Sequence, residues 1–178
     1  MQLTDLLPIE KWIDFEKEIV AKSGMDANIF GPDGVRITDF KAWANRLCPT
    51  IKAEPRGQSF ICAVAHMNIA TMAKNQGRPV VEECDAGLAK LVVPIIVDDQ
   101  FVGAVGACGA LLDDGEVDDF MINKTTGIKE ETITEVVDGI PNVTSGSINE
   151  LKDFIVTKID AIVEAYLSTI PRPDPTWH

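Results

Sequence analysis

The spacing of apolar residues predicts a helix and a hairpin at the start of the chain. Ile9 to Lys22 places its apolar residues at helical spacing, and Ser23-Gly24 then ends the segment. Residues 26–30 and 35–38 are two short strand candidates on either side of Gly31-Pro32-Asp33-Gly34. Because proline presets φ and glycine accepts a positive φ, this order predicts a hairpin.

Two further helices are predicted in the next part of the chain. Phe40 to Leu47 is a short helix candidate that ends before Cys48-Pro49. Gln58 to Gln76 is apolar on nearly every side, and Gly77 ends it. We therefore expect a helix that is buried over most of its circumference.

Three strands are predicted after these helices. Val80 to Cys84 is a short strand candidate, and Lys90 to Val97 is a dense β-branched run typical of a central strand. Pro94 lies inside that run and indicates an edge, a bulge or a break in the ladder. After a turn at residues 98–100, Phe101 to Leu111 is expected to return as a second long strand.

The last third of the chain predicts helices. Glu116 to Lys124 and Ile128 to Val137 are short helix candidates, and Ser147 to Thr169 is a long one with an apolar stripe. Ser147 followed by Glu150 fits a capping box. Residues 171–178 are rich in proline and are expected to form an exposed tail.

Together these elements predict a single α+β domain in which helices flank an antiparallel sheet. The order of helix, hairpin, helices, two long antiparallel strands and terminal helix resembles that of PAS- and GAF-like domains. This resemblance implies a small-molecule cavity on one face of the sheet.

Composition excludes several classes of function. The chain has 178 residues, 46% apolar and 25% charged, which is typical of one globular domain. Its net charge of −12 argues against direct binding to nucleic acid or to an anionic membrane. Residues 1–8 lack the basic start of a signal peptide, and no apolar run is long enough to span a bilayer. We therefore expect a cytoplasmic protein.

Four cysteines supply the candidate chemistry, because in a reducing cytosol they are free to bind a metal, react or line a pocket. Cys62 and His66 are spaced i, i+4, which puts them on one helix face about 6 Å apart and suits two ligands of one metal. For this pair alone, a buried thiol and a hydrogen-bonded core histidine form the simpler interpretation.

The other cysteines strengthen the case for a shared site. Cys48 and Cys84 each lie at the end of a predicted element, as Cys62 does, and ends of elements meet at one rim. We expect these three thiols to converge in one cavity beside the sheet, with His66 on its wall. Cys108 is either a further ligand or a small hydrophobic residue in a glycine-rich strand.

Several short motifs resemble one family of sensors. They are Leu47-Cys48-Pro49, Phe60-Ile61-Cys62, Glu83-Cys84-Asp85-Ala86-Gly87-Leu88, Val93 to Val97 and Phe101 to Gly109. With these motifs the chain resembles the PocR-type sensory domain, a PAS/GAF-like ligand-binding module. The resemblance implies that residues 1–170 form a sensor for small organic or redox ligands, with cysteines at the site and no catalysis. Members of this family are usually fused to a DNA-binding, kinase or cyclase output. Because the sequence has no helix-turn-helix or catalytic block, we expect a separate signalling output protein as a partner.

Two alternatives stay open beside a sensor. One is a zinc or iron–sulfur module, whose ligands would be Cys48, Cys62, Cys84 and either His66 or Cys108. The other is a thiol-dependent enzyme, which is disfavoured because a catalytic cysteine needs a histidine base and an orienting partner. If the thiols do not converge, we expect a plain cavity lined by Phe60, Val64, Met67 and Phe101.

The terminal helix also suggests an assembly. The apolar stripe of residues 147–169 is wider than a lone exposed helix would carry. It packs across the sheet of its own domain, or part of it pairs with a second copy. We expect a homodimer.

Overall fold

Strand β4 (Gln100–Leu112) is the centre of the sheet. It pairs antiparallel with β1 (Asp26–Phe30) and β3 (Ala89–Val97), and β2 (Val80–Glu83) extends the sheet beyond β3. The short strand β5 (Asn142–Val143) runs parallel to the far end of β4. The computed structural model describes residues 1–170, so the predicted tail at 171–178 lies outside the described residues.

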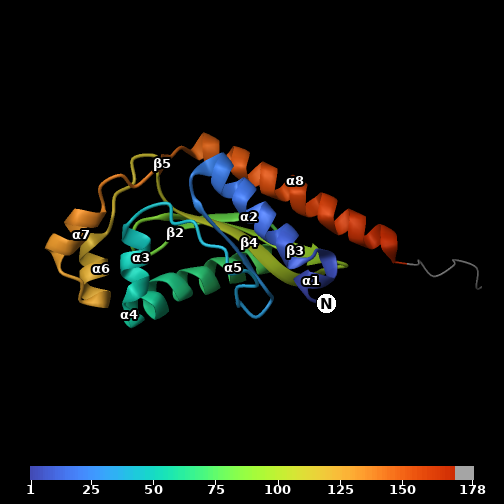
Figure 1. Cartoon of the computed structure of the whole chain (residues 1–178), viewed down its shortest axis with the longest axis horizontal. Helices are drawn as coiled ribbons and strands as arrows, with labels where there is room; N and C mark the ends of the chain where they lie inside the picture. Colours follow the sequence, from blue (N-terminus) through green and yellow to red (C-terminus); the bar gives the residue numbers. More distant parts are fainter. Residues whose placement is uncertain (171–178) are drawn as a thin grey trace, which may run out of the picture.

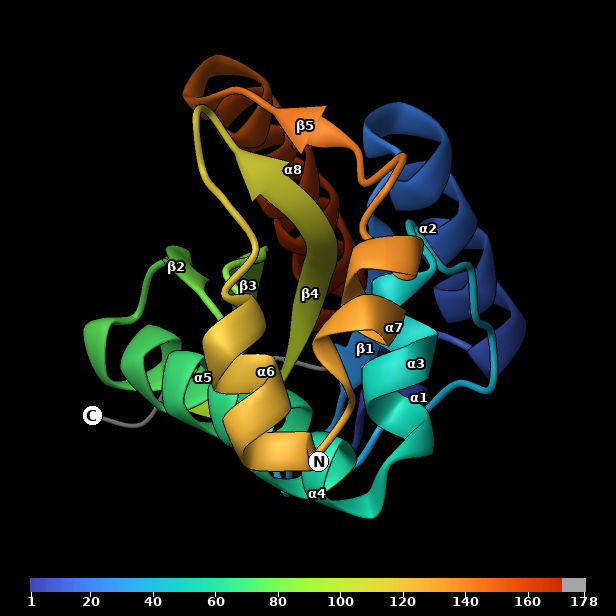
Figure 2. The ribbon, with the colours of Figure 1, turned by 90° about the vertical axis from the view of Figure 1, so that its left-hand side faces the viewer.

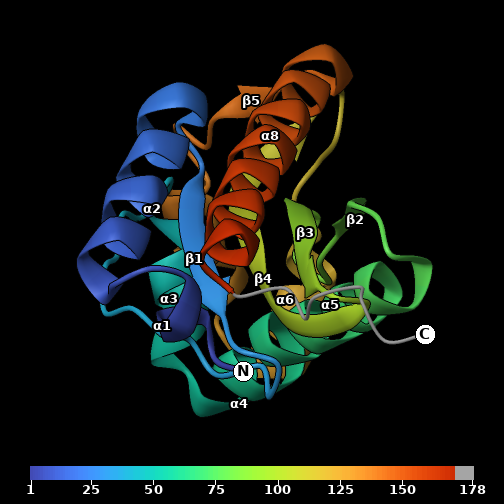
Figure 3. The same cartoon turned by 90° about the vertical axis from the view of Figure 1, so that its right-hand side faces the viewer.

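Helices cover both faces of this sheet (Figure 1). On one face lie α1 (Leu3–Leu6), α2 (Ile9–Ser23) and α8 (Ser145–Thr169), as Figure 3 shows. On the other face lie α3 (Leu47–Ala53), α4 (Pro55–Gly57), the π-helical segment η1 (Gln58–Ala63) and α5 (Val64–Gln76). Helices α6 (Asp119–Thr126) and α7 (Glu130–Val136) enclose one end (Figure 2). The predicted α+β class, an antiparallel sheet flanked by helices in one domain, is confirmed.

The face of the sheet toward α2 and α8 is apolar. Successive residues of a strand point to opposite faces, and Ala27 and Ile29 of β1 lie across from Ala107 and Val105 of β4. All four are buried in the core that α2 and α8 complete. This core fixes the register of the sheet, because a slip by one residue would expose it.

The same alternation puts polar residues on the opposite face, toward α5. Asp26 and Asn28 lie across from Cys108 and Gly106, and Lys90 of β3 also lies across from Cys108. The register of β1, β4 and β3 therefore places a carboxylate, an amide, an ammonium group and a thiol on the same side of three adjacent strands.

The stripe of α8 packs against the sheet of its own domain. Ile148, Leu151, Ile155 and Ile159 are all buried there. The helix begins after Thr144, whose side chain and that of Ser147 form a reciprocal capping box, so the predicted box at Ser147 and Glu150 is corrected. Although α8 has 25 residues, neither it nor any other helix within residues 1–170 is apolar over a stretch that would cross a bilayer.

Boundaries around the first loop differ from the prediction. Residues 35–38 form no second strand, because the turn closes through an isolated bridge between Phe30 and Arg36. Residues 40–46 are not helical, and α3 instead begins at Leu47 and contains Cys48-Pro49. Proline fits the first turn of a helix because the N–H it lacks would have no partner there. The prediction thus placed Cys48 at the wrong end of a helix.

The helix over residues 58–76 is present but less buried than expected. Only one side of η1 and α5 contacts the domain, through Ile61, His66, Ile69 and Ala73. The side chains of Phe60 and Met67 are 56% and 63% exposed, so the expectation of burial on most sides is wrong. No further layer of the described chain covers the outer side of this helix.

Candidate ligand cavity

A cavity of about 610 Å³ lies between the polar side of the sheet and α3, η1 and α5. Its floor is formed by β1, β3 and β4, and the loop over residues 31–46 contributes Asp33, Arg36 and Trp43 to its rim. The volume is in the usual range for small-molecule sites in proteins. We call this space the ligand cavity.

All four cysteines line the ligand cavity. Cys48 comes from the first turn of α3, Cys62 from η1, Cys84 from the turn after β2, and Cys108 from β4. His66 lies on the same wall as Cys62, one turn further along the helix. The structure therefore brings together the residues in which the sequence predicted a site, and all four thiols are free.

The cavity wall favours the neutral form of Cys48, Cys62 and Cys84. Burial raises the pKa of Cys48 to about 12 and that of Cys62 to about 11, and burial also raises the pKa of Cys84. The side-chain N–H groups of Asn45 and Asn28 donate to the sulfurs of Cys48 and Cys108, at 3.4 Å and 3.7 Å. Since the thiolate is the nucleophile and the metal ligand, this environment disfavours thiol chemistry at neutral pH.

The described residues give the metal-binding alternative no support. Within residues 1–170, no three or more His, Cys, Asp or Glu side chains are arranged so that they could hold a metal ion. The predicted ligand set of Cys48, Cys62, Cys84, His66 and Cys108 shares the cavity wall without forming such a group. Thiols that line a cavity without holding a metal form a polarizable apolar surface.

Four polar residues of the cavity are buried, and three of them hold side-chain atoms without a partner. Asp26, Asn28, His66 and Lys90 are between 4% and 7% exposed. One oxygen of Asp26, the amide oxygen of Asn28 and both ring nitrogens of His66 have no hydrogen-bond partner among residues 1–170. Buried polar atoms without partners are rare and costly, so these groups are open to a ligand or to water.

Backbone register makes room for these polar side chains. Gly106 lies across from Asn28, and a Cβ atom at this glycine would lie 2.3 Å from the amide oxygen of Asn28. Gly109 has a φ of +93°, which favours glycine, and it receives the N–H of Asn45 at its carbonyl, 2.6 Å away. The glycines of β4 thus open the floor of the cavity.

His66 is held by its neighbours as a neutral imidazole. Its ring lies against that of Phe30, with the centroids 3.5 Å apart. Burial, helped by the charges of Lys90 and Lys52, lowers the pKa of His66 to about 3. A neutral imidazole offers a ligand one donor and one acceptor.

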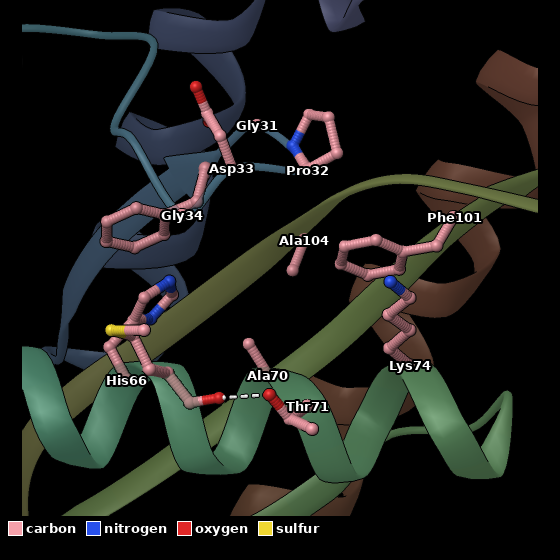
Figure 4. Close-up of a pocket in the computed structure, with 12 residues that line it drawn as sticks. Gly31, Pro32, Asp33, Gly34, His66, Ala70, Thr71, Lys74, Phe101 and Ala104 are labelled. Carbon is pink, nitrogen blue, oxygen red and sulfur yellow. Dashed lines mark hydrogen bonds between the residues drawn. The ribbon is translucent and has the colours of Figure 1, made fainter.

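A smaller hollow of about 140 Å³ adjoins the ligand cavity and shares Phe30, His66 and Met67 with it (Figure 4). Phe101 lines this hollow rather than the cavity, and the ammonium group of Lys74 lies 5.5 Å from the centre of its ring. Phe60 and Val64 line neither space and are exposed, which corrects their prediction as cavity residues. They lie on the outer side of the helix.

The loop over residues 31–46 is tied down by one buried ion pair. Arg36 donates to Glu16 at 3.0 Å and to the carbonyl oxygens of Ala27, at 2.8 Å, and Phe40. The hydroxyl of Thr38 donates to the same oxygen of Glu16 at 2.8 Å. Glu16 is fully buried in α2, so the loop that borders the cavity is anchored to the helix layer beside it.

Sequence reasoning missed Asp26, Asn28 and Lys90. A signal was present, because Asp26 and Asn28 alternate with the apolar Ala27 and Ile29, as expected for a strand with one polar side. The pattern alone reads as a solvent-exposed side. Only the packing of α3 and α5 over that side turns it into the wall of a cavity.

We expect the neutral state of His66 to appear as a pH-dependent stability. Between pH 6.5 and about 3 the unfolded chain binds a proton at His66 that the folded chain does not bind. The free energy of unfolding therefore rises with pH in this window, by up to about 1.4 kcal/mol per pH unit.

Urea unfolding of the wild type and of His66→Gln at steps from pH 4 to pH 8 measures this effect. Buried carboxyl groups are common to both proteins and cancel in the difference between them. The free energy of unfolding of the wild type, minus that of His66→Gln, should rise with pH up to about pH 6.5 and then become constant. A difference independent of pH would show that His66 titrates as a free histidine.

Comparison with known proteins identifies the family of this chain. Neither the curated proteins nor the solved structures give a significant match. A model of the sensory domain found in PocR matches residues 5–167, which extends the predicted resemblance over nearly the whole chain. The chain therefore belongs to the PocR sensory domain family.

Proposed function

We propose that this domain senses a small organic molecule that binds in the ligand cavity. One observation carries the proposal: a cavity of about 610 Å³ whose wall includes buried polar atoms of Asp26, Asn28 and His66 without partners. A ligand that pairs with these atoms removes the cost of leaving them bare. Membership of a sensory-domain family supports the same function.

The cysteines act in this proposal as walls of the pocket. The raised pKa values of Cys48, Cys62 and Cys84 favour neutral thiols, which pack against a ligand and hardly react at neutral pH. We therefore favour an organic ligand over redox sensing, metal binding or thiol catalysis, and we propose that the domain has no enzymatic activity. Four free thiols also support a reducing, cytoplasmic setting. We propose in addition that a separate output protein reads the bound state.

A thermal-shift screen with a matched pair of variants tests the proposal. Ala63 lines the cavity, and Ala63→Phe should fill part of it, whereas Asn68→Phe adds a phenyl ring at an exposed position on the same helix outside the cavity. Compounds that bind should raise the melting temperature of the wild type and of Asn68→Phe. By mass action, saturation at about 100 times Kd adds about 2.7 kcal/mol to the free energy of unfolding.

In this screen, Ala63→Phe should lose the shift. The library should contain diverse small acids, amides, diols and amines. If no compound in it stabilises the wild type more than Ala63→Phe, the proposed function is contradicted.

We also propose that the domain forms a homodimer. The last turns of α8 carry Ile162, Val163, Tyr166 and Leu167, which are only partly buried against their own domain. Figure 3 shows α8 along the outer side of the sheet, where a second copy has access to it. Light scattering should give twice the chain mass at micromolar concentration, and Val163→Glu should restore the single mass. A single mass for the wild type at high micromolar concentration would rule the dimer out.

A further inference from the structure

The ligand cavity has the opposite charge balance from the rest of the chain. Four cationic side chains line it, Arg36, Lys41, Lys52 and Lys90, against the carboxylates of Asp26 and Asp33. The whole chain has a net charge of −12. A positive site in an acidic protein attracts anions locally, while the rest of the surface repels them.

Three of these cations form no ion pair within the residues that the structure describes, and of these Lys41 is exposed. Arg36 is paired with the buried carboxylate of Glu16 at 3.0 Å, which offsets its charge. Lys52 and Lys90 form no ion pair within residues 1–170. Lys90 is only 7% exposed, so its ammonium group is available chiefly to what enters the cavity. A buried charge without a partner is costly, which favours an occupant that supplies one.

Lys90 and Lys52 reach the cavity from opposite walls. Lys90 stands on β3, in the floor, and Lys52 stands on α3, in the roof, with its ammonium group 4.9 Å from the ring centre of Trp43. Burial raises the pKa values of Cys62 and Asp26 and lowers that of His66. The charges of both lysines act to lower all three pKa values, so both lysines act on groups spread over the cavity wall. The two lysines therefore define a positive region between floor and roof.

Acceptors stand beside this positive region. One carboxylate oxygen of Asp26 and the amide oxygen of Asn28 have no hydrogen-bond donor among residues 1–170. Both residues lie on β1, which is separated from Lys90 on β3 by strand β4 alone. A ligand that satisfies both sets carries an acidic group for the lysines and a hydroxyl or N–H group for the oxygens. A simple cation is disfavoured because the two lysines repel it. A hydrocarbon is disfavoured because it forms no hydrogen bond or ion pair with any of these groups.

We propose that the ligand is a small organic anion whose carboxylate, sulfonate or phosphate group binds between Lys52 and Lys90 and whose hydroxyl or N–H donor binds Asp26 and Asn28. This inference rests on the proposed function, because it names the chemical class of the molecule in the same cavity. It predicts that charge, more than size, selects the ligand.

The cysteines allow a test that needs no known ligand. The chain has four cysteines and all four line the cavity, so every reaction of a thiol reagent reports on a molecule inside it. We would compare 2-sulfonatoethyl methanethiosulfonate, which is anionic, with 2-(trimethylammonium)ethyl methanethiosulfonate, which is cationic. The rate of each reagent with the protein is divided by the rate of the same reagent with 2-mercaptoethanol. This division removes the difference in intrinsic reactivity between the two reagents.

The anionic reagent should react faster by about 10-fold or more, and the ratio should fall as salt is added. Lys90→Met and Lys52→Met should each lower the ratio of the anionic to the cationic rate. Lys17→Met removes the same charge from an exposed position on α2 and should leave this ratio unchanged. Lys52 is only half-buried, so its variant provides the test if Lys90→Met does not fold. Equal rates, or a faster cationic reagent, would overturn the inference.

The compound screen separates this inference from the proposed function. Acids should stabilise the wild type, and their neutral amides should bind at least about 10-fold more weakly, because an amide forms no charge-assisted bonds to the lysines. Amides that bind as tightly as the acids would contradict the anionic ligand and leave the proposed sensor intact. A screen with no ligand of either kind would contradict the proposed function itself. Carboxylates and phosphates in the library show which acidic group is preferred.

Discussion

Replacing Arg36 by methionine should destabilise the protein by about 3–5 kcal/mol, the cost of leaving a buried charge without its partner. Arg36 is 18% exposed in its side chain, and its partner Glu16 is fully buried. Burial raises the pKa of Glu16, and the Thr38 hydroxyl and Arg36 act against that rise. Without Arg36, the carboxylate keeps the cost of burial and loses both the opposite charge and the hydrogen bond of Arg36, so that only the Thr38 hydroxyl still compensates for burial.

The destabilisation by Arg36→Met should also depend on pH. A carboxyl group with a raised folded pKa loses stability as pH rises above its unfolded pKa, because folding then requires burial of the charged form. The variant should therefore recover part of its stability as the pH falls and Glu16 takes up a proton. Urea unfolding at pH 5 and pH 7 measures both effects.

A matched pair gives the control for this prediction. Lys158 and Glu18 form an ion pair at 2.8 Å with both side chains more than 40% exposed, and Lys158→Met should cost less than about 1 kcal/mol. Adding Glu16→Gln to Arg36→Met should restore part of the loss, since a neutral amide is cheaper to bury. Equal losses in Arg36→Met and Lys158→Met would show that the loop is not anchored by this pair.

Cys48 and Cys62 of the ligand cavity should react slowly with alkylating reagents. With pKa values of about 11 for Cys62 and about 12 for Cys48, against an ordinary 9.0, their thiolate fractions at pH 8 fall about 100-fold and 1000-fold. A more basic thiolate is also a better nucleophile, which recovers about half of this on a logarithmic scale. The net expectation is a rate about 10-fold lower for Cys62 and about 30-fold lower for Cys48.

Iodoacetamide labelling followed by peptide mass analysis measures each rate, with the urea-unfolded chain as reference. The rates should rise up to about pH 11 instead of levelling off near pH 9. A cysteine in the folded protein that reacts at pH 7 as fast as in the unfolded chain would reveal a stabilised thiolate. That result would favour redox or thiol chemistry over a passive wall.

The sequence predicted the elements whose apolar residues repeat with a clear period, and it missed the segments whose conformation depends on tertiary contacts. The helix at Ile9, the strands β3 and β4 and the long helix α8 follow from periodicity alone. Pro94 was expected at an edge or a break, and β2 indeed pairs with β3 only as far as Val92. The stretch over residues 35–46 is irregular because Arg36 bonds to Glu16 in a distant helix, which no local pattern records.

The site was predicted through its cysteines and not through its polar atoms. Three thiols at the ends of elements suggested a shared cavity, since such ends meet at one rim. Lys90 lies in an otherwise β-branched run, and Asp26 and Asn28 lie in a short strand, so each has an ordinary exposed interpretation. Their burial depends on α3 and α5 covering that side of the sheet, and this is a property of tertiary packing.

Amide spectra of the labelled protein, titrated with the most stabilising compound of the screen, test the ligand cavity most directly. The account predicts shifts concentrated at Asn28, His66, Lys90 and Cys108, at which the cavity floor and wall meet. It predicts the same shifts in Asn68→Phe and none in Ala63→Phe. Shifts confined to α2 and α8, or shifts unchanged in Ala63→Phe, would contradict a ligand site between the sheet and α5.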